Sequence, residues 1–420
     1  AAPRGGALAG RLLALQAQHL GRSAEDDISA YGMRRLGPGR HLDGAAGDQA
    51  QGHQTGGGEG EQAGSEHVTS LPVVHTGGMA GDVPHSSIPR GEAALLARML
   101  PHLRLGAEVE LGPGDDAAVV RLPSPRLVVT TDSLVEGHDF LRHVTTARWI
   151  GHKAAVQNLA DVAAMGARPL ALVVAISAPA GTPAAVFEEL TIGLTARAEA
   201  DGASIVGGDL GRADQLMVTV TAMGTLPEEQ RAITRSGALP GDVLAIGAPR
   251  LGRSAAGLAL VLGRRALLKT ADSGRPTLML SGIQDPSAAE HVRWHDAPDP
   301  DLSLGWTGGR AAHAMMDLSD GLARDGGRLA RASGVTIDLD RAALASDVEQ
   351  LAGLAAELGA DPWEWVLHGG EEHAMLATFA PEELPPGFRA IGRVLPPAVQ
   401  GPGVLLGGVP IEGEGFDHFA

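Results

Sequence analysis

The chain has 420 residues, of which 44% are hydrophobic and only 3% aromatic, and its formal net charge is −17. This length suffices for two or three domains, and the acidic balance excludes a protein that binds nucleic acid through a basic face. The sequence contains no cysteine, which excludes disulfides, a thiol nucleophile and a zinc–thiolate site. No apolar run approaches the length of a membrane span, and Arg11 interrupts the one stretch with some likeness to a signal peptide, so we expect a cytoplasmic protein.

Residues 1–86 differ in composition from the rest of the chain. They include the run GDQAQGHQTGGGEGEQAGSEH, which is rich in Gly, Gln and Glu and has no apolar periodicity. Such a segment cannot bury enough apolar surface to fold, so we predict a disordered extension. It is either an artefact of a misplaced start codon or a regulatory tail, and no feature of the sequence favours the tail.

Regular elements are predicted from residue 89 onwards. Leu95, Leu96, Met99 and Leu103 have helical spacing, and a Gly-Pro-Gly turn follows in the stretch LGPGDDAAVV. The elements expected next are a strand from Ala117, a strand at 127–131 ended by Asp132, a helix at 147–166, a strand at 171–178, a helix at 185–202, and strands at 204–209 and 216–225.

A cluster of turn residues at 234–242 predicts a domain boundary, which gives domains at 87–233 and 234–420. In the second domain we expect a strand at 243–248, helices at 254–263 and within 307–334, and a strand at 374–379. The Pro- and Asp-bearing stretch 281–305 is interpreted as an irregular connection. The whole is predicted to be an α/β protein with two lobes.

Six acidic positions stand beside glycines or at the ends of predicted elements. They are Asp115–Asp116, Asp132, Asp161, Asp209, Asp317 and Asp320. Hydroxyl side chains flank several of them, and carboxylates beside hydroxyls are the oxygen ligands that Mg²⁺ prefers. Each aspartate taken singly is better explained as a helix cap or turn former, whereas for the set the metal and the capping interpretations both stay open.

The chain has no P-loop motif for phosphate binding. Gly208 before Asp209 would let a backbone approach a phosphate closely, and Arg235 could bind a phosphate oxygen with its guanidinium. A surface arginine beside a turn is the plainer alternative for Arg235. Lys153, Asn158 and Asp161 share one predicted helix, where a solvated helix face is the alternative to a functional one.

Eight stretches together resemble the thiamine-monophosphate kinase family, within the ATP-using superfamily that includes aminoimidazole ribonucleotide synthetase and selenophosphate synthetase. They are LGPGDDAAVV, VVTTDSLVEGHDF, KAAVQNLADVAAMGARP, IVGGD, ITRSGALPGDVLAIG, DLSDGLARDGGRLA, LHGGEEHAMLAT and GFDHF. They occur in the family's order and run from about residue 91 to 419.

The resemblance implies a phosphotransferase that converts ATP and thiamine monophosphate to ADP and thiamine diphosphate by direct in-line transfer, assisted by several Mg²⁺ ions. The metal ligands that it implies are Asp116, Thr130, Thr131, Asp132, Asp161, Asp209, Asp317 and Asp320. The ATP contacts that it implies are Gly208, Asp209, Arg235 and Ser319. The substrate contacts that it implies are Glu371, Phe416 and one of His138 and Asp139.

The resemblance also implies an architecture. Relatives have an N-terminal α/β domain whose strands pair with those of a second subunit, forming a barrel across a homodimer, and a C-terminal α/β sandwich. The sequence departs from the family pattern near the substrate, where a histidine is displaced to His138 or replaced by Asp139, and where Glu372-His373-Ala374 follow Glu371. Two other hypotheses stay open: another synthetase of the superfamily, and a non-catalytic relative that kept the fold.

Overall fold

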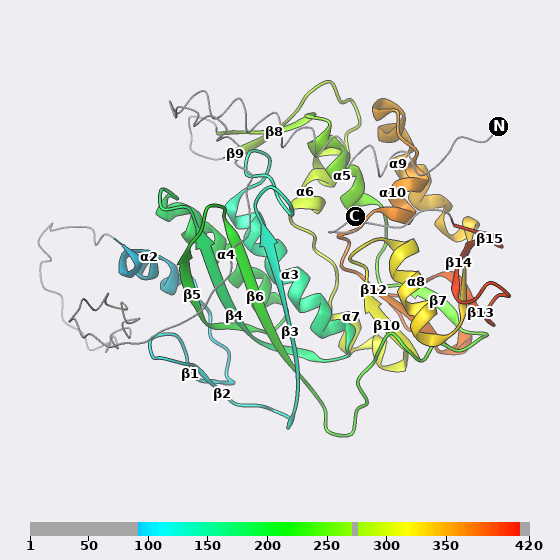
Figure 1. Ribbon diagram of the computed structural model, residues 1–420, viewed down its shortest axis with the longest axis horizontal. Helices are drawn as coiled ribbons and strands as arrows, with labels where there is room; N and C mark the ends of the chain where they lie inside the picture. Colours follow the sequence, from blue (N-terminus) through cyan, green and yellow to red (C-terminus); the bar gives the residue numbers. More distant parts are fainter. Residues whose placement is uncertain (1–90, 271–275, 412–420) are drawn as a thin grey trace, which may run out of the picture.

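The computed structural model describes residues 91–270 and 276–411, which form two main sheets with helices packed against them (Figure 1). The predicted mixed α/β character is therefore present. Phe416 and the extension predicted at residues 1–86 lie outside the described residues. Within the described part, no helix is both long enough and apolar enough to cross a membrane.

The first main sheet has the strand order β3-β6-β4-β5 (Figure 1). Its strands are β3 (Arg126–Val135), β4 (Arg168–Ala178), β5 (Ser204–Arg212) and β6 (Met217–Leu226). Strand β6 is antiparallel to both β3 and β4, whereas β4 and β5 are parallel and are joined through helix α4 (Ala184–Ala200). Strands β3 and β5 consequently form the two opposite edges of this sheet.

Helix α3 (Ala147–Ala164) packs on one face of the first sheet and lies against α4. Two glycines allow the two helices to meet backbone to backbone. A Cβ atom at Gly151 would lie 2.1 Å from the carbonyl oxygen of Leu190. One at Gly193 would lie 1.9 Å from the carbonyl oxygen of Arg148. Any larger residue at either position would force the helices apart.

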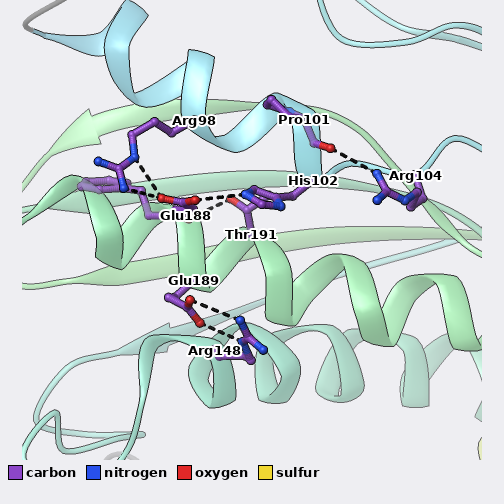
Figure 2. Close-up of polar contacts among 9 residues, drawn as sticks. Arg98, Pro101, His102, Arg104, Arg148, Glu188, Glu189 and Thr191 are labelled. Atoms are coloured by element: carbon purple, nitrogen blue, oxygen red, sulfur yellow. Dashed lines mark hydrogen bonds and ion pairs between the residues drawn. The ribbon is translucent and has the colours of Figure 1, made fainter. Parts of the chain in front are cut away.

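Helix α2 (Glu92–Met99) and the 3₁₀ turn η1 (Leu100–His102) attach to the outer side of α4. Figure 2 shows the polar contacts there: Arg98 Nε donates to Glu188 Oε2 at 2.9 Å, and His102 Nε2 lies 3.2 Å from Glu188 Oε1. Arg148 of α3 pairs with Glu189 of α4 below them. These pairs lie at the surface, so each contributes little to the free energy of unfolding. Their main effect is to hold the helices in position.

The second main sheet has seven strands in the order β10-β12-β7-β13-β11-β14-β15, and only β11 and β14 run parallel among the neighbours. The strands are β7 (Val243–Ile246), β10 (Ala314–Asp317), β11 (Thr336–Leu339), β12 (Met375–Phe379), β13 (Arg389–Leu395), β14 (Gly403–Leu406) and β15 (Val409–Pro410). Strands β7, β10, β11 and β12 are buried nearly throughout, which indicates cover on both faces.

Six helices belong to the second half of the described chain: α5 (Arg253–Leu262), α6 (Ala288–Asp296), α7 (Ser303–Trp306), α8 (Leu322–Ser333), α9 (Arg341–Leu358) and α10 (Pro362–His368). Helices α8 and α9 end at glycines in the left-handed conformation, Gly334 and Gly359. The remaining short elements are β1 (Val109–Leu111), β2 (Val119–Val120), β8 (Ala266–Thr270), β9 (Pro276–Leu280), η2 (Gly308–Ala311) and η3 (Pro381–Glu383).

Helix α3 joins the two halves of the molecule, because it packs on the first sheet and also contacts α7 and β10 (Figure 1). At the α7 contact, a Cβ atom at Gly305 would lie 2.2 Å from the carbonyl oxygen of Ala163. One hydrophobic core runs from the first sheet through α3 to Met375 and Phe388 of the second half. Side chains on α3 can therefore meet side chains of either sheet.

Helix α8 forms within 307–334 as expected, and buried strand β10 precedes it. Two other sequence expectations about elements are wrong. The stretch 281–305, expected to be irregular, contains α6 and α7, because Val292 and Ala288 give α6 a buried face despite the flanking prolines. Strands β3 and β5 extend past Asp132 and Asp209, because their partner strands continue, so neither aspartate ends its strand.

Candidate active site

Three of the expected metal ligands come from three different elements that meet at α3. Asp132 lies on β3, Asp161 on α3 and Asp317 at the end of β10. Thr130 Oγ1 donates a hydrogen bond of 2.8 Å to Asp161 Oδ2, and Gln157 Nε2 donates to Asp132 Oδ2. Because side chains alternate along a strand, Thr130 and Asp132 both point to the α3 face of β3.

These three aspartates lie close enough together for the negative charges of Asp317 and Asp132 to raise the pKa of Asp161. The pKa of the Asp161 carboxyl is raised to about 6: burial is the largest cause, the charges of Asp317 and Asp132 add to it, and the hydrogen bond from Thr130 opposes it. Carboxylates that repel each other in a partly buried place favour either a proton or a cation between them. We therefore name Asp132, Asp161 and Asp317 the carboxylate group of the site.

Asp317 is hydrogen-bonded to a buried histidine, His373. Its carboxylate is 4% exposed, and His373 Nδ1 lies 3.3 Å from Asp317 Oδ2. Burial alone would lower the pKa of His373, but the hydrogen bond and the charge of Asp317 outweigh it and raise the pKa. Sequence reasoning missed this role of His373, although its position in GGEEH, where the family pattern differs, marked it as unusual.

Asp320 and Ser319 lie in the turn between β10 and α8, where arginines neutralise the acidic charge. Arg328 Nη2 lies 2.6 Å from Asp320 Oδ2, and Arg328 Nη1 donates to Asp325 Oδ1 at 2.8 Å. The Asp325 side chain is fully buried and accepts a 2.7 Å hydrogen bond from the backbone N–H of Asp320. Sequence reasoning missed Asp325, which shapes this turn from the first turn of α8.

The other expected metal and ATP ligands do not join the carboxylate group. Asp116 is exposed in the loop between β1 and β2, where its backbone N–H donates to Asp115 Oδ1. Asp209 lies on β5, the sheet edge opposite β3, and the strand register places it on the same face as Ser133 and Thr131. Arg235 is exposed in the connection before β7.

Gly208, expected to let the backbone approach a phosphate, and Gly370, which precedes Glu371, are both explained by backbone packing in the structure. A Cβ atom at Gly208 would lie 1.9 Å from the carbonyl oxygen of Val174 on the neighbouring strand. A Cβ atom at Gly370 would lie 2.4 Å from the carbonyl oxygen of Ser319. The close approach of protein backbone therefore requires glycine at both positions, whether or not a phosphate binds nearby.

The interpretation of the α3 surface as a solvated face is wrong for Lys153 and Asn158, which are each 1% exposed. Lys153 Nζ donates to Glu371 Oε2 at 2.7 Å and to the carbonyl oxygen of Asp139 at 3.1 Å. His295 Nδ1 lies 3.3 Å from the same Glu371 oxygen. The sequence signal for this cluster was the rarity of lysine, of which the chain has only two.

The expected substrate contacts lie beside this lysine or outside the described residues. His138 is exposed in the turn after β3, and Asp139 Oδ2 accepts a 2.7 Å hydrogen bond from the backbone N–H of Val135. Glu371 is half-buried and has a positive φ of 61°, a strained conformation for a residue with a side chain. Glu372 is instead buried and accepts from Ser254 N and Trp294 Nε1.

The residues present fit a hard divalent cation in chemical type. Carboxylates and a threonine hydroxyl are oxygen donors, and because burial and the charges of Asp317 and Asp132 raise the pKa of Asp161, a cation would stabilise its ionised form. Among the described residues, no three acidic, histidine or cysteine side chains already stand close enough together to hold a metal ion. The carboxylate group therefore offers oxygen donors of the right chemical type without forming a complete metal site by itself.

Comparison with known proteins agrees with this arrangement. A family described as AIR synthase related protein, N-terminal domain, matches residues 114–226, which include β3 to β6 and α3. A solved structure of AaThiL complexed with AMPPCP and TMP matches with a TM-score of 0.61 and 30% identity, covering 73% of this chain and 91% of that chain. The fold is therefore that of the AIR synthase-related class.

Curated relatives define the family within this class. Thiamine-monophosphate kinase of Mycobacterium tuberculosis (strain H37Rv) is 44% identical over 331 residues, covering 79% of this chain and 90% of the relative. That of Escherichia coli (strain K12) is 33% identical over 352 residues, covering 79% of this chain and 98% of the relative. The chain belongs to the thiamine-monophosphate kinase family, which confirms the resemblance seen in its motifs.

Proposed function

We propose that this protein transfers the γ-phosphoryl group of ATP to the phosphate of thiamine monophosphate, giving ADP and thiamine diphosphate. The observation that carries the proposal is the match to thiamine-monophosphate kinases over 90% or more of their length. The meeting of Asp132, Asp161 and Asp317 at α3 supports it further, since carboxylates are what a metal-assisted phosphoryl transfer needs.

Several Mg²⁺ ions are proposed as cofactors, held by Asp132, Asp161 and Asp317 with the Thr130 hydroxyl nearby. When bound, Mg²⁺ supplies the positive charge that neutralises phosphate oxygens and allows two anions to approach. The further ligands that we propose are Asp116, Thr131, Asp209 and Asp320.

The chain's own side chains orient the carboxylate group. Thr130 fixes one oxygen of Asp161, Gln157 fixes one of Asp132, and His373 fixes one of Asp317. Hydrogen bonds of this kind orient a carboxylate before a ligand binds, and Asp132 is held at both oxygens, because its Oδ1 also accepts from Ser133 N at 2.7 Å. A phosphate oxygen of the acceptor is already ionised near neutral pH, so the transfer requires positioning rather than a covalent nucleophile.

The nucleotide and substrate contacts remain proposals on the family's pattern. Gly208, Asp209, Arg235 and Ser319 are proposed to contact ATP. Glu371, Phe416 and one of His138 and Asp139 are proposed to contact thiamine monophosphate. His138 is the more available of the last two, because Asp139 Oδ2 is engaged by the backbone of its own turn. The cytoplasmic location predicted from the sequence also stays a prediction.

A homodimer is proposed, and the first sheet supports it. Edge strand β3 is ten residues long, and its outer face exposes Leu127 and Val129 at 45% and 56%. Val173 of β4 is 38% exposed on the same face. Long apolar edges of this kind are normally covered by another chain or another element.

The strand order also bears on how Asp209 could share a metal with β3. Adjacent strands are about 4.8 Å apart, so β5 and β3 of one chain are about 14 Å apart across the sheet. One cation cannot span that distance with ligand bonds of about 2 Å. We therefore propose that Asp209 acts beside strand β3 of a second copy, where the two sheets meet edge to edge.

The test of the proposed function is to incubate the protein with ATP, Mg²⁺ and thiamine monophosphate and to separate the products by chromatography. Thiamine diphosphate and ADP should appear in equal amounts. Thiamine, which lacks the acceptor phosphate, is the control acceptor and should give no product. Formation of ADP without thiamine diphosphate would contradict the proposal. Sedimentation showing a monomer under the active conditions would contradict the homodimer.

A further inference from the structure

Lys153 is a buried cation in the middle of α3. Its side chain is 1% exposed, and the only other lysine of the chain, Lys269, is exposed on β8. A buried ammonium is costly unless it is paired and hydrogen-bonded. The hydrogen-bond partners of the ammonium group therefore indicate the role of Lys153.

The ammonium of Lys153 connects two loops that come from opposite halves of the chain. Nζ donates to the carbonyl oxygen of Asp139 at 3.1 Å, in the turn that follows β3. It also donates to Glu371 Oε2 at 2.7 Å, in the turn that precedes β12. Apart from Phe416, the side chains proposed to contact thiamine monophosphate lie in these two turns, so one cation fixes the separation of both turns.

Glu371 is held by one oxygen and leaves the other available. Oε2 lies against Lys153 and against His295 Nδ1, whereas Oε1 has no hydrogen-bond partner among the described residues. The side chain is 31% exposed. Its backbone is fixed as well, because Glu371 N donates to the carbonyl oxygen of Ser319 at 2.7 Å. The free oxygen therefore has a defined direction before any ligand binds.

Lys153 is the charged partner of Glu371 in this contact. Burial, helped by the charge of Lys153, lowers the pKa of His295 to about 4, so His295 is a neutral neighbour near pH 7. Burial alone would raise the pKa of Glu371, but Lys153 and the two nearby histidines outweigh it and lower the pKa. Glu371 is consequently ionised, and Lys153 is the cation that keeps it so.

We propose that Lys153 is a positioning residue for the acceptor substrate: it holds the Glu371 carboxylate and the turn after β3 in the spacing that receives the organic part of thiamine monophosphate. This inference deepens the proposed function and rests on it. An ionised carboxylate with one free oxygen suits an amino donor or a cationic ring, both of which thiamine carries. A purely structural role for Lys153, joining the two halves of the molecule, is the alternative that the test must separate.

The test compares Lys153→Met with the wild-type protein and with Lys269→Met as a matched control. In Lys153→Met we expect KM for thiamine monophosphate to rise about tenfold to a hundredfold, the range for losing one charge-assisted hydrogen bond. KM for ATP should stay within about twofold, because the carboxylate group does not contact Lys153. Lys269→Met should leave both constants unchanged.

A double-mutant cycle with Glu371→Gln separates positioning from general structure. If Lys153 acts through Glu371, adding Lys153→Met to Glu371→Gln should raise KM for thiamine monophosphate little further. If Lys153 only joins the two halves, the effects should multiply and both KM values should rise together. Where Lys153→Met does not fold, Lys153→Gln keeps a shorter donor and takes its place in the cycle.

Each outcome decides something. An unchanged KM for thiamine monophosphate, an equal rise for ATP, or multiplying effects would overturn the positioning role while leaving the proposed function intact. A wild-type protein that binds ATP with Mg²⁺ but does not phosphorylate thiamine monophosphate would overturn the proposed function and this inference with it.

Discussion

Two regions that meet at α3, the carboxylate group and the contact between Lys153 and Glu371, shift the pKa values of their carboxyl groups in opposite directions. In the carboxylate group of Asp132, Asp161 and Asp317, burial and then the charges of the two neighbouring aspartates raise the pKa of Asp161 to about 6. At the junction around Lys153, one ammonium compensates one carboxylate, and the pKa of Glu371 is lowered. We propose that the first region takes a cation from solution and that the second presents a fixed anion to a ligand.

The largest expected effect is on turnover, in the carboxylate group. Asp132→Asn removes a full negative charge from the proposed metal site, and we expect kcat to fall by about three orders of magnitude or more, in line with the loss of a metal-binding carboxylate. Near-normal turnover would remove Asp132 from the site. Asp214→Asn, an exposed aspartate in the turn after β5, is the matched control and should turn over at the wild-type rate.

The next effect is on stability and concerns Asp296, a buried residue at the end of α6 that is close enough to Lys153 and Glu371 for their charges to affect its pKa. Burial raises the pKa of Asp296 to about 7 from its ordinary value of 3.8, despite the opposing charge of Lys153. The native state therefore binds this proton more tightly than the unfolded chain does. The stability that it contributes is complete below pH 3.8 and is lost as pH rises through about 7.

Asp296→Asn should remove this pH dependence. Between about pH 4 and pH 8, the unfolding free energy of the wild type should fall relative to that of the variant by about 2–4 kcal/mol. Urea unfolding at several pH values measures the difference. A constant difference across the range would show that Asp296 titrates alike in both states.

A smaller effect on the unfolding free energy should have opposite signs for one variant in the carboxylate group and one at Lys153. Without Mg²⁺, Asp161→Asn relieves repulsion, and we expect the unfolding free energy at pH 7 to rise by about 1–2 kcal/mol. Lys153→Met leaves half-buried Glu371 without its cation, and we expect a fall of about 1–2 kcal/mol. Chemical denaturation measures both, and the same sign for both variants would contradict the comparison.

The last prediction is that deleting the N-terminal extension leaves the kinetic constants unchanged. The proposed site residues all lie between Asp116 and Phe416, so deleting residues 1–85 should leave kcat and both KM values unchanged. Steady-state kinetics of the shortened chain measures this, and a large loss of turnover would establish a function for that extension.

Much of the fold was predictable where the signal is local. The helix expected at 147–166 matches α3 closely, because a long apolar pattern precedes Gly166, and the strand at 171–178 lies within β4. The prediction failed where tertiary contacts override local composition. Helix α6 forms in a stretch rich in Pro and Asp because the second core covers Ala288 and Val292.

The site was predictable in kind but not in geometry. The motif order marked the aspartates as candidates, yet nothing local could show that Asp209 stands three strands from Asp132. The contact between Lys153 and Glu371 joins residues 218 positions apart, and only the packing of α3 against both halves of the chain creates it. Pairings of this kind depend on topology, which no single motif encodes.

The most direct test of the central claim is the Mg²⁺ dependence of thiamine monophosphate phosphorylation, measured as thiamine diphosphate formed at saturating ATP. The account predicts no product with EDTA, full recovery when Mg²⁺ is added back, and a much higher Mg²⁺ requirement in Asp161→Asn than in Lys153→Met. Product formation that persists in EDTA, or an equal shift in Mg²⁺ requirement in both variants, would contradict the division of roles between the two regions.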